Sequence, residues 1–343
     1  MRDPSAEWHI DIGDYPSAGS DAEKLSFLLR YAILAPSGHN TQPWMFQIQG
    51  DQVELYADRT RGLPVVDPYD RALTLSCGAA IGSLRIAMRR FGHEGIFELL
   101  PAAGDPDLLA RIRLGNSWTP SAVDHSLFEA ITRRRTTRRP FENEPLPEQL
   151  IDQLRAIAAE DAVELVLLTE ASAKSAVAAL VAEGDRIQFA DPRFRRELGS
   201  WVHSRRAASR DGMSGAGFGM PDVLSSIGGL VIRTFDMGKG IGAKDQEISL
   251  HSPALAIVAT AGDEPRDWLS AGAAHMVMLL AAGACGLTAA YLNQPVEVDE
   301  LRPRLAAAAG VQGVPQLLFR LGRGPQIQPA VRRPVAEVLR KLG

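Results

Sequence analysis

The feature that most constrains the fold is a pattern that occurs twice along the chain. Ser-Cys-Gly-Ala-Ala at residues 76–80 and Ser-Ala-Gly-Ala-Ala at residues 270–274 each open an alanine-rich segment with helical character. Each segment closes at a glycine, Gly92 or Gly286, 16 residues after its first serine. Because a pattern that recurs in this way marks a repeated structural unit, two similar halves are predicted.

Two further matches follow the same order along the chain. Segments ending in Arg-Leu-Gly, at residues 113–115 and 320–322, lie after the paired helices, and amphipathic segments from Leu25 to Ala35 and from Leu150 to Ala159 lie before them. Three matches in one order favour duplication over chance. We therefore predict an α+β fold of two tandem half-repeats, with mostly antiparallel sheets flanked by helices, divided into residues 1–120 and 121–343.

The first half begins with clear local signals. Ser20-Asp21-Ala22-Glu23 has the spacing of a capping box, and the apolar residues after it predict a helix that ends near Pro36. Met45–Gln49 and Val53–Ala57, separated by Gly50-Asp51, predict a pair of strands. The short segment that follows Pro36 therefore joins a helix to a strand.

The second half alone carries a long insertion, at about residues 172–250. Its glycine-dense segment Asp211–Pro221 cannot form a helix or a central strand, so a mobile loop is predicted. Met213, Phe218 and Met220 are apolar enough to cover a flat ligand. We expect this loop to act as a lid; a surface loop without such a role is the alternative.

The strongest local charge is the segment Arg133–Arg139, which holds five arginines in seven positions. A solvated surface cluster is one interpretation. The interleaved Thr136 and Thr137 favour another, a phosphate site, because guanidinium groups match phosphate geometry and hydroxyl groups add short-range donors. A second basic pair, Arg332-Arg333, is a candidate to complete that site.

Two turns could contact a flat heteroaromatic ligand. Ser37 to Trp44 packs small and hydrogen-bonding residues into one turn, and Leu292-Asn293-Gln294 follows an apolar strand. Structurally, the first need only end a helix and start a strand, and the second need only be the end of a strand.

Composition excludes several classes of function. The formal net charge of −4 gives no overall reason to bind nucleic acid or an anionic membrane. The N-terminus carries no apolar stretch like that of a signal peptide, so a cytoplasmic protein is expected. Cys77 and Cys285 are predicted to be reduced core residues, and no histidine has the spacing of a metal site.

Taken together, these motifs resemble those of the FMN-dependent nitroreductase family. Ala35–Phe46 resembles the segment that these enzymes place over FMN, and Arg135–Phe141 resembles their phosphate-binding Arg-x-Ser-x-Arg/Lys-x-Phe opening, with Thr137 in the place of serine. The Gly-Ala-Ala helices, the turn Leu292–Pro295 and the segment Arg332–Pro334 extend the resemblance over most of the chain apart from the insertion.

The resemblance implies a nitroreductase-like fold in which one chain replaces the family homodimer. In the family, the arginine-rich opening and the Pro-Ser turn of one FMN site come from different subunits. This chain keeps the turn only in its first half and the arginines only in its second, so one FMN site is expected, as in the fused single-chain Acg-like group. The fusion would allow a monomer, and further association stays open.

The implied cofactor contacts divide into three groups, and none of the implied residues is catalytic. Arg135, Thr136, Thr137 and Arg139 would hold the FMN phosphate, helped by Arg332 or Arg333. Pro36, Ser37, Gly38 and Asn40 would contact the ribityl chain and the ring, and Leu292, Asn293 and Gln294 would line the ring edge. Lys244 and Gln246 are weaker candidates for the pyrimidine end.

Three functions remain open from the sequence. The first is an oxidoreductase that passes hydride from NAD(P)H through FMN to a nitroaromatic or quinone-like acceptor. The second is a flavin-sequestering or flavin-modifying protein with a closed site and little reductase activity. The third, an anion-binding structural protein without flavin, leaves the Pro-Ser turn unused.

Overall fold

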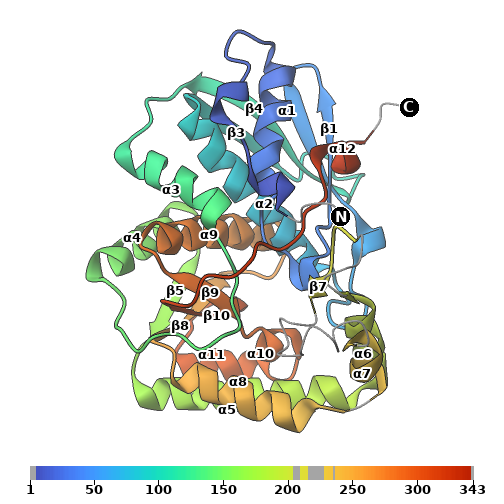
Figure 1. Cartoon of the computed structure of the whole chain (residues 1–343), viewed down its shortest axis with the longest axis vertical. Coiled ribbons are helices and arrows are strands. Elements are labelled where there is room, and N and C mark those ends of the chain that lie inside the picture. Colours follow the sequence, from blue (N-terminus) through green and yellow to red (C-terminus); the bar gives the residue numbers. More distant parts are fainter. Residues whose placement is uncertain (1–4, 204–208, 215–227, 235, 341–343) are drawn as a thin grey trace.

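Two four-stranded antiparallel sheets form the framework of the chain (Figure 1). They are seen in a computed structural model that describes residues 5–203, 209–214, 228–234 and 236–340. The first sheet has the order β1-β2-β4-β3, and the second has the order β5-β8-β10-β9. Across both sheets, the neighbouring strands are therefore the first, second, fourth and third strands of that sheet in sequence order. This identity of topology confirms the predicted α+β fold with two similar halves.

The first half follows the sequence signals closely. The Ser20 hydroxyl accepts a hydrogen bond from the Glu23 backbone N–H, and the Glu23 carboxylate accepts one from the Ser20 backbone N–H, so the predicted capping box starts the first helix. The elements are α1 (Asp21–Ala32), β1 (Trp44–Gln49), β2 (Gln52–Ala57), α2 (Arg71–Arg90), β3 (His93–Leu99) and β4 (Leu108–Ser117). Helix α3 (Ala122–Arg133) then leads to the second half.

The second half repeats this plan around a large insertion. Its repeated elements are α4 (Glu148–Glu160), β5 (Glu164–Leu168), β8 (Ala254–Thr260), α9 (Pro265–Ala284), β9 (Thr288–Tyr291) and β10 (Val314–Gly322). Short helices α10 (Gln294–Glu297) and α11 (Arg302–Ala309) join β9 to β10, and α12 (Val335–Val338) lies near the C-terminus. The division at residue 120 stays a prediction.

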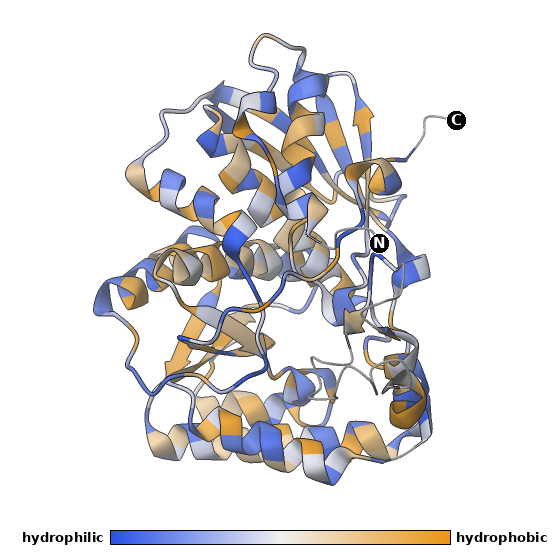
Figure 2. Ribbon diagram, in the orientation of Figure 1, coloured by the Kyte–Doolittle hydropathy of each residue, from blue (hydrophilic) through white to orange (hydrophobic). Residues whose placement is uncertain are grey.

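Helices α2 and α9 pack directly against each other between the sheets (Figure 1). A Cβ atom added to Gly78 would lie against the Leu269 carbonyl, and one added to Gly272 would lie against the Leu75 carbonyl. Swapping the two helices turns one contact into the other. This is the geometry expected when two helices are related by an approximate two-fold axis. Apolar residues are accordingly concentrated along the strands and along these two helices, in the interior of the molecule (Figure 2).

The insertion forms a separate helical layer beside the second sheet (Figure 1). It contains α5 (Ala171–Ala190), α6 (Pro192–Ser200), β6 (Val202–His203), β7 (Met213–Ser214), α7 (Gly228–Thr234) and α8 (Gly238–Leu250). Phe189, Phe194 and Ile232 pack with Leu63 and Val66, so the insertion also contacts the first half. Most of the predicted lid, including Phe218 and Met220, lies outside the described residues.

Some local expectations need correction. Helix α2 begins at Arg71 rather than near Ser76, because Arg71 is buried and donates to the Gln316 backbone oxygen at 2.6 Å. Strand β3 was not anticipated from the sequence. Cys77 is buried as expected, but Cys285 is exposed at the end of α9, where the helix leaves the core.

The C-terminal segment crosses from the second half to the first (Figure 1). After β10, an inner strand of the second sheet, the chain runs to β1, where the Arg340 N–H donates to the Phe46 carbonyl at 2.7 Å. Leu339 forms a parallel bridge with Phe46. This crossing carries Arg332 and Arg333 to the turn that follows α1.

Candidate functional site

The turn after α1 has an unusual backbone. His39, Asn40 and Gln42 have φ angles of 48°, 56° and 52°, in the left-handed region that non-glycine residues seldom adopt. The Ser37 hydroxyl accepts from the Gln42 N–H at 2.9 Å, and the buried Gln42 amide donates to the Arg210 carbonyl at 2.7 Å. Because strained backbone persists only where the surroundings hold it, the turn is a built feature of the fold and more than the end of a helix.

Arg332 ties the C-terminal segment to this turn. Its guanidinium donates to the Asn40 side-chain oxygen at 2.9 Å and to the carbonyls of Leu34 and Ala35 at 3.2 and 3.1 Å. Arg332 is 4% exposed. Residues from opposite ends of the chain thus meet at the C-terminal end of α1, where free carbonyl groups attract cations.

Arg333 lies beside Arg332 but faces another way. Its backbone N–H and its guanidinium both contact Gln42, at 2.7 and 3.1 Å, and its guanidinium lies 3.7 Å from the Asp58 carboxylate. Because these partners already satisfy it, Arg333 serves mainly to hold the turn.

The predicted phosphate segment runs beside the edge strand β9. Thr136 forms a parallel bridge with Ala289, and the Thr288 hydroxyl donates to the Arg135 carbonyl at 2.9 Å. In such an extended segment, successive side chains point to opposite sides. The segment therefore presents two different faces, one of even-numbered and one of odd-numbered residues.

The even-numbered residues face the turn of the first half. Arg134 donates to the Leu34 carbonyl and to the Thr136 hydroxyl, each at 3.2 Å. The Arg138 guanidinium lies 3.3 Å from the Met213 sulfur. Desolvation by the surrounding protein and, to a smaller extent, the charge of Arg138 lower the pKa of the His39 imidazole to about 4. Arg134, Thr136 and Arg138 thus share the side on which Asn40 and Arg332 lie.

The odd-numbered residues have different surroundings from one another. Thr137 is 1% exposed, and its hydroxyl accepts from the Arg139 N–H at 3.3 Å. The Arg135 guanidinium folds back on the carbonyls of Thr132 and Arg134, both at 2.8 Å, but it stays close enough to Arg332 to lower the pKa of that residue. The Arg139 side chain is exposed.

Three guanidinium groups surround one indole ring. Arg135, Arg332 and Arg134 lie 4.6, 4.9 and 5.8 Å from the ring centre of Trp8. The Trp8 indole N–H donates to the Ala330 carbonyl at 2.8 Å, which fixes the ring in place. This role could not be predicted, because a single tryptophan near an N-terminus has no pattern around it.

Buried cations in this region lack full partners. Burial lowers the pKa of Arg134 to about 10, and burial together with Arg134 and Arg135 lowers the pKa of Arg332. The Nε atoms of both arginines have no hydrogen-bond partner among the described residues. Because buried donors are nearly always paired in folded proteins, these atoms mark a place suited to an anion.

Arg320 of β10 adds a cation that the site residues predicted from the sequence did not include. It is fully buried, donates to the carbonyls of Thr137 and Arg139 at 3.2 and 2.8 Å, and leaves its Nε and Nη1 atoms unpaired among the described residues. Its guanidinium stacks 3.9 Å from the ring centre of Phe141. An arginine inside an otherwise apolar strand was the signal that could have identified it.

The third predicted segment, Leu292 to Gln294, lies where β9 meets α10. Asn293 accepts from the Leu318 N–H at 2.9 Å, which fixes the turn, and Leu292 is buried. Gln294 contacts Asp245, whose carboxylate also attracts Arg138. Asp245 therefore lies between this turn and the arginine segment.

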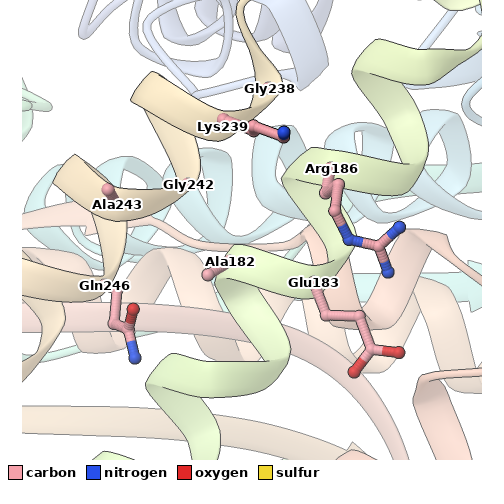
Figure 3. Close-up of a pocket in the computed structure, with 8 residues that line it drawn as sticks. All are labelled: Ala182, Glu183, Arg186, Gly238, Lys239, Gly242, Ala243 and Gln246. Atoms are coloured by element: carbon pink, nitrogen blue, oxygen red, sulfur yellow. The ribbon is translucent and has the colours of Figure 1, made fainter.

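The weaker candidates lie elsewhere. Gln246 lines a groove of about 310 Å³ between α5 and α8, together with Ala182, Glu183, Arg186, Gly238, Lys239, Gly242 and Ala243 (Figure 3). Lys244 is exposed on the same helix. No hydrogen bond given for the described residues links Lys244 or Gln246 to the turn after α1.

The described end of the insertion lies on the turn. The Gly212 N–H donates to the Asn40 carbonyl at 3.2 Å, and the Asn40 side chain donates to the Gly212 carbonyl at 3.0 Å. Asp211 pairs with Arg61, and Arg210 pairs with Glu337. The insertion is thus anchored next to the arginines.

The described residues contain no group of three or more His, Cys, Asp or Glu side chains placed to hold a metal ion. Within the same residues, no helix is long and apolar enough to cross a bilayer.

Comparisons with known proteins identify relatives over the whole chain. Two proteins of Mycobacterium tuberculosis, both named "Putative NAD(P)H nitroreductase", are similar to it. The first, Rv3131, is 31% identical over 325 residues, which cover 93% of this chain and 92% of the relative. The second, acg, is 28% identical over 319 residues, which cover 90% and 93%. No protein-family model matches the chain.

Solved structures give more distant matches. The FMN-dependent nitroreductase NfnB from Mycobacterium smegmatis, in complex with NADPH, is 13% identical with a TM-score of 0.40, covering 64% of this chain and 99% of that one. A nitroreductase with bound FMN from Bacteroides fragilis is 16% identical with a TM-score of 0.36, covering 60% and 94%.

The sequence relatives decide the family. Identity of 31% runs through nearly the full length of both chains, so the similarity covers both halves and the insertion. The chain therefore belongs to the nitroreductase family.

Proposed function

We propose that this chain is a cytoplasmic FMN-dependent oxidoreductase that transfers hydride from NAD(P)H to a nitroaromatic or quinone-like acceptor. One observation carries the proposal: Arg332 and Arg134 of the second half converge on the turn of the first half, at Leu34. The two motifs that the family resemblance requires in one FMN site, far apart in the sequence, are adjacent in the fold. The names of the full-length relatives support NAD(P)H as the electron donor.

The residues present fit the phosphate end of FMN. Arg134, Arg332 and Arg320 are buried cations with unpaired nitrogen atoms among the described residues, and Thr136 adds a hydroxyl group. A phosphate supplies several charged acceptor atoms to such donors at once. An ordinary structural ion-pair network would place carboxylates beside all of these arginines, whereas the partners of Arg134 and Arg332 are carbonyl, amide and hydroxyl oxygens.

The two faces of the arginine segment refine the expected contacts. We assign the phosphate contacts to Arg134, Thr136 and Arg138, because these residues face Asn40 and Arg332. Arg135, Thr137 and Arg139 would then support the segment from its other face. Pro36, Ser37, Gly38 and Asn40 keep their proposed role beside the ribityl chain and the ring, and Leu292, Asn293 and Gln294 keep theirs at the ring edge.

The protein's contribution would be binding and electrostatics. When bound, FMN accepts a hydride from NAD(P)H and passes the electrons to the acceptor. The cationic cluster would favour the anionic reduced cofactor, and the strained turn would hold the ring face at a fixed position. The His39 imidazole, neutral at physiological pH because its pKa is lowered to about 4, would be a polar group without charge at that face.

A second function is favoured by the position of the insertion. Gly212 is bonded to Asn40 from both directions, and the Met213 sulfur contacts Arg138. An insertion anchored in this way could keep the same site closed, and the chain would then store or modify flavin with little reductase activity.

Anaerobic reduction separates these functions. We expect the purified protein to be yellow and its flavin absorbance to bleach on addition of NADPH or NADH. A yellow protein that resists bleaching by both, yet is bleached by dithionite, would replace the reductase with the storage function. A colourless protein that binds no added FMN would overturn both.

A further inference from the structure

One buried amide lies between two carboxylates from different helices of the insertion. Gln294, the first residue of α10, donates from Nε2 to Oδ1 of Asp185 in α5 at 3.0 Å and to Oδ2 of Asp245 in α8 at 3.2 Å. Both N–H bonds of the amide are therefore used. The contact joins the insertion to the turn that follows β9.

Two acceptor atoms at this contact have no donor. Asp185 is 2% exposed, and its Oδ2 atom has no partner among the described residues. The same holds for Oε1 of Gln294. A carboxylate and an amide oxygen are both acceptors, whereas a protonated carboxyl group gains an O–H donor. A single proton on Asp185 would thus supply the donor that this buried pair lacks.

The helices around this contact approach one another closely through glycine residues. A Cβ atom added to Gly184 would lie 2.7 Å from the Gln294 Cβ atom. Cβ atoms added to Gly238 and Gly242 would lie 3.1 Å from the Asp185 carbonyl oxygen and 3.0 Å from the Ala182 carbonyl oxygen. Figure 3 shows Ala182 on α5 opposite Gly238 and Gly242 on α8. While the helices are packed in this way, both carboxylates stay within reach of the same amide.

The surrounding charges decide which carboxyl group holds the proton. Asp245 is attracted by Arg138, Lys244 and Arg320, which offset part of its burial. Among the described residues, the charges that act most on Asp185 are instead those of Asp245 and Glu297, both acidic. Burial first, and then Asp245, raise the pKa of Asp185 from its ordinary value of 3.8 to about 8.

Glu297, the remaining acid at this contact, has its own partners. It accepts from the Gln188 side chain at 2.8 Å and is attracted by Arg71, while Asp67 and Glu197 repel it. Burial is the largest cause of its raised pKa. Its neutral form would add no charge beside Asp185, and its ionised form would favour the proton on Asp185 further.

We propose that Asp185, Gln294 and Asp245 form a proton-dependent latch that closes α5 and α8 of the insertion against α10. The latch is closed while Asp185 carries its proton and opens when that proton leaves. This inference goes beyond the proposed oxidoreductase function, because it concerns the packing of α5, α8 and α10 whether or not flavin is bound.

The sign of the pH effect follows from linkage. In the open form Asp185 reaches water and regains its ordinary low pKa, whereas in the closed form its pKa is about 8. Closure is therefore fully favoured below the open-form pKa and weakens as pH rises toward 8. Each pH unit in that window should shift the balance toward the open form about tenfold, and above about pH 8 the shift should stop.

Hydrogen exchange tests the latch directly. Amide exchange in α5 and α8 would be measured between about pH 6 and pH 9 and corrected for the intrinsic rate, in the parent chain and in Asp185→Asn. Asparagine presents an N–H donor where the protonated acid presents its O–H, so this variant should stay closed. We expect protection in the parent chain to fall about tenfold per pH unit up to about pH 8, and protection in the variant to stay level.

Controls keep the result interpretable. Asp152→Asn removes a carboxylate whose side chain is 78% exposed on α4, and it should keep the parent profile. Parallel profiles in the parent chain and Asp185→Asn would overturn the latch. If Asp185→Asn does not fold, infrared spectra of the parent chain give the answer. A protonated carboxyl band that disappears near pH 8 supports the latch, and its absence at pH 6 overturns it.

Discussion

Gly272→Ala should destabilise the protein severely, although it adds only one methyl group. The new Cβ atom would lie closer than 3.0 Å to the Leu75 carbonyl oxygen and carbon, a separation that real Cβ atoms essentially never show. The obstacle is backbone, so no side chain can rotate away. Overpacking of this kind costs about 1 to 3 kcal/mol or more of unfolding free energy, which denaturant or thermal unfolding would measure.

A matched control lies in the same helix. At Gly283 an added Cβ atom would meet only the Ala130 methyl group, at 3.4 Å. Gly283→Ala should therefore leave stability unchanged or raise it by up to about 1 kcal/mol, because alanine favours helix over glycine. Similar losses in both variants would mean that α2 and α9 do not pack as described.

This contact explains why the fold could be predicted from the sequence. Gly78 and Gly272 occupy the same place in the two Gly-Ala-Ala motifs, and each allows the approach of the partner helix's backbone. A repeated steric requirement leaves a repeated sequence. The equivalence of these helices was thus visible in the sequence, as were the capping box at Ser20 and the strand pair β1-β2, whereas the direct contact of the two helices was not predicted.

The elements that were missed depend on partners far along the chain. Strand β3 has no fully buried residue and lies at the edge of its sheet, so its apolar pattern is weak. The first turn of α2 is held by the contact of Arg71 with Gln316, which is 245 residues away, and by Asp67, which accepts from the Ala72 and Leu73 N–H groups. Asp67 was a local signal for an earlier helix start, whereas the contact with Gln316 leaves no trace in the local sequence.

Arg138→Ala should weaken FMN binding by about ten- to 150-fold. This corresponds to about 1.5 to 3 kcal/mol, the usual worth of a hydrogen bond to a charged group. This expected loss of affinity rests on the proposed contact between Arg138 and the FMN phosphate. Desolvation by the surrounding protein lowers the pKa of Arg138, although its side chain is exposed. Titration of the FMN-free protein with FMN, followed by quenching of flavin fluorescence, would give the dissociation constants.

Two neighbouring arginines provide controls that remove the same charge. Arg133 is exposed and pairs with Glu129 within α3, so Arg133→Ala should leave FMN affinity nearly unchanged. Arg139→Ala should have a smaller effect than Arg138→Ala if the even-numbered face holds the phosphate. Equal losses in all three variants would replace the phosphate pocket with a diffuse basic surface.

The two faces of the segment Arg133–Arg139 could not be distinguished from the sequence alone. The run Arg133–Arg139 indicated an anion site, but consecutive arginines look alike in a sequence. Only the pairing of Thr136 with Ala289 decides which side chains turn toward Asn40. Arg320 was overlooked for a related reason, since its burial depends on the carbonyls of Thr137 and Arg139.

The number of FMN molecules per chain tests the central claim most directly. If the turn of the first half and the arginines of the second build one site, each motif is used once. Absorbance of the FMN released from denatured, FMN-saturated protein, divided by the protein concentration, should then give a ratio near one. A ratio near two would mean that the second half rebuilds a turn of its own, and a ratio near zero would mean that the site is not a flavin site; either result would contradict the account.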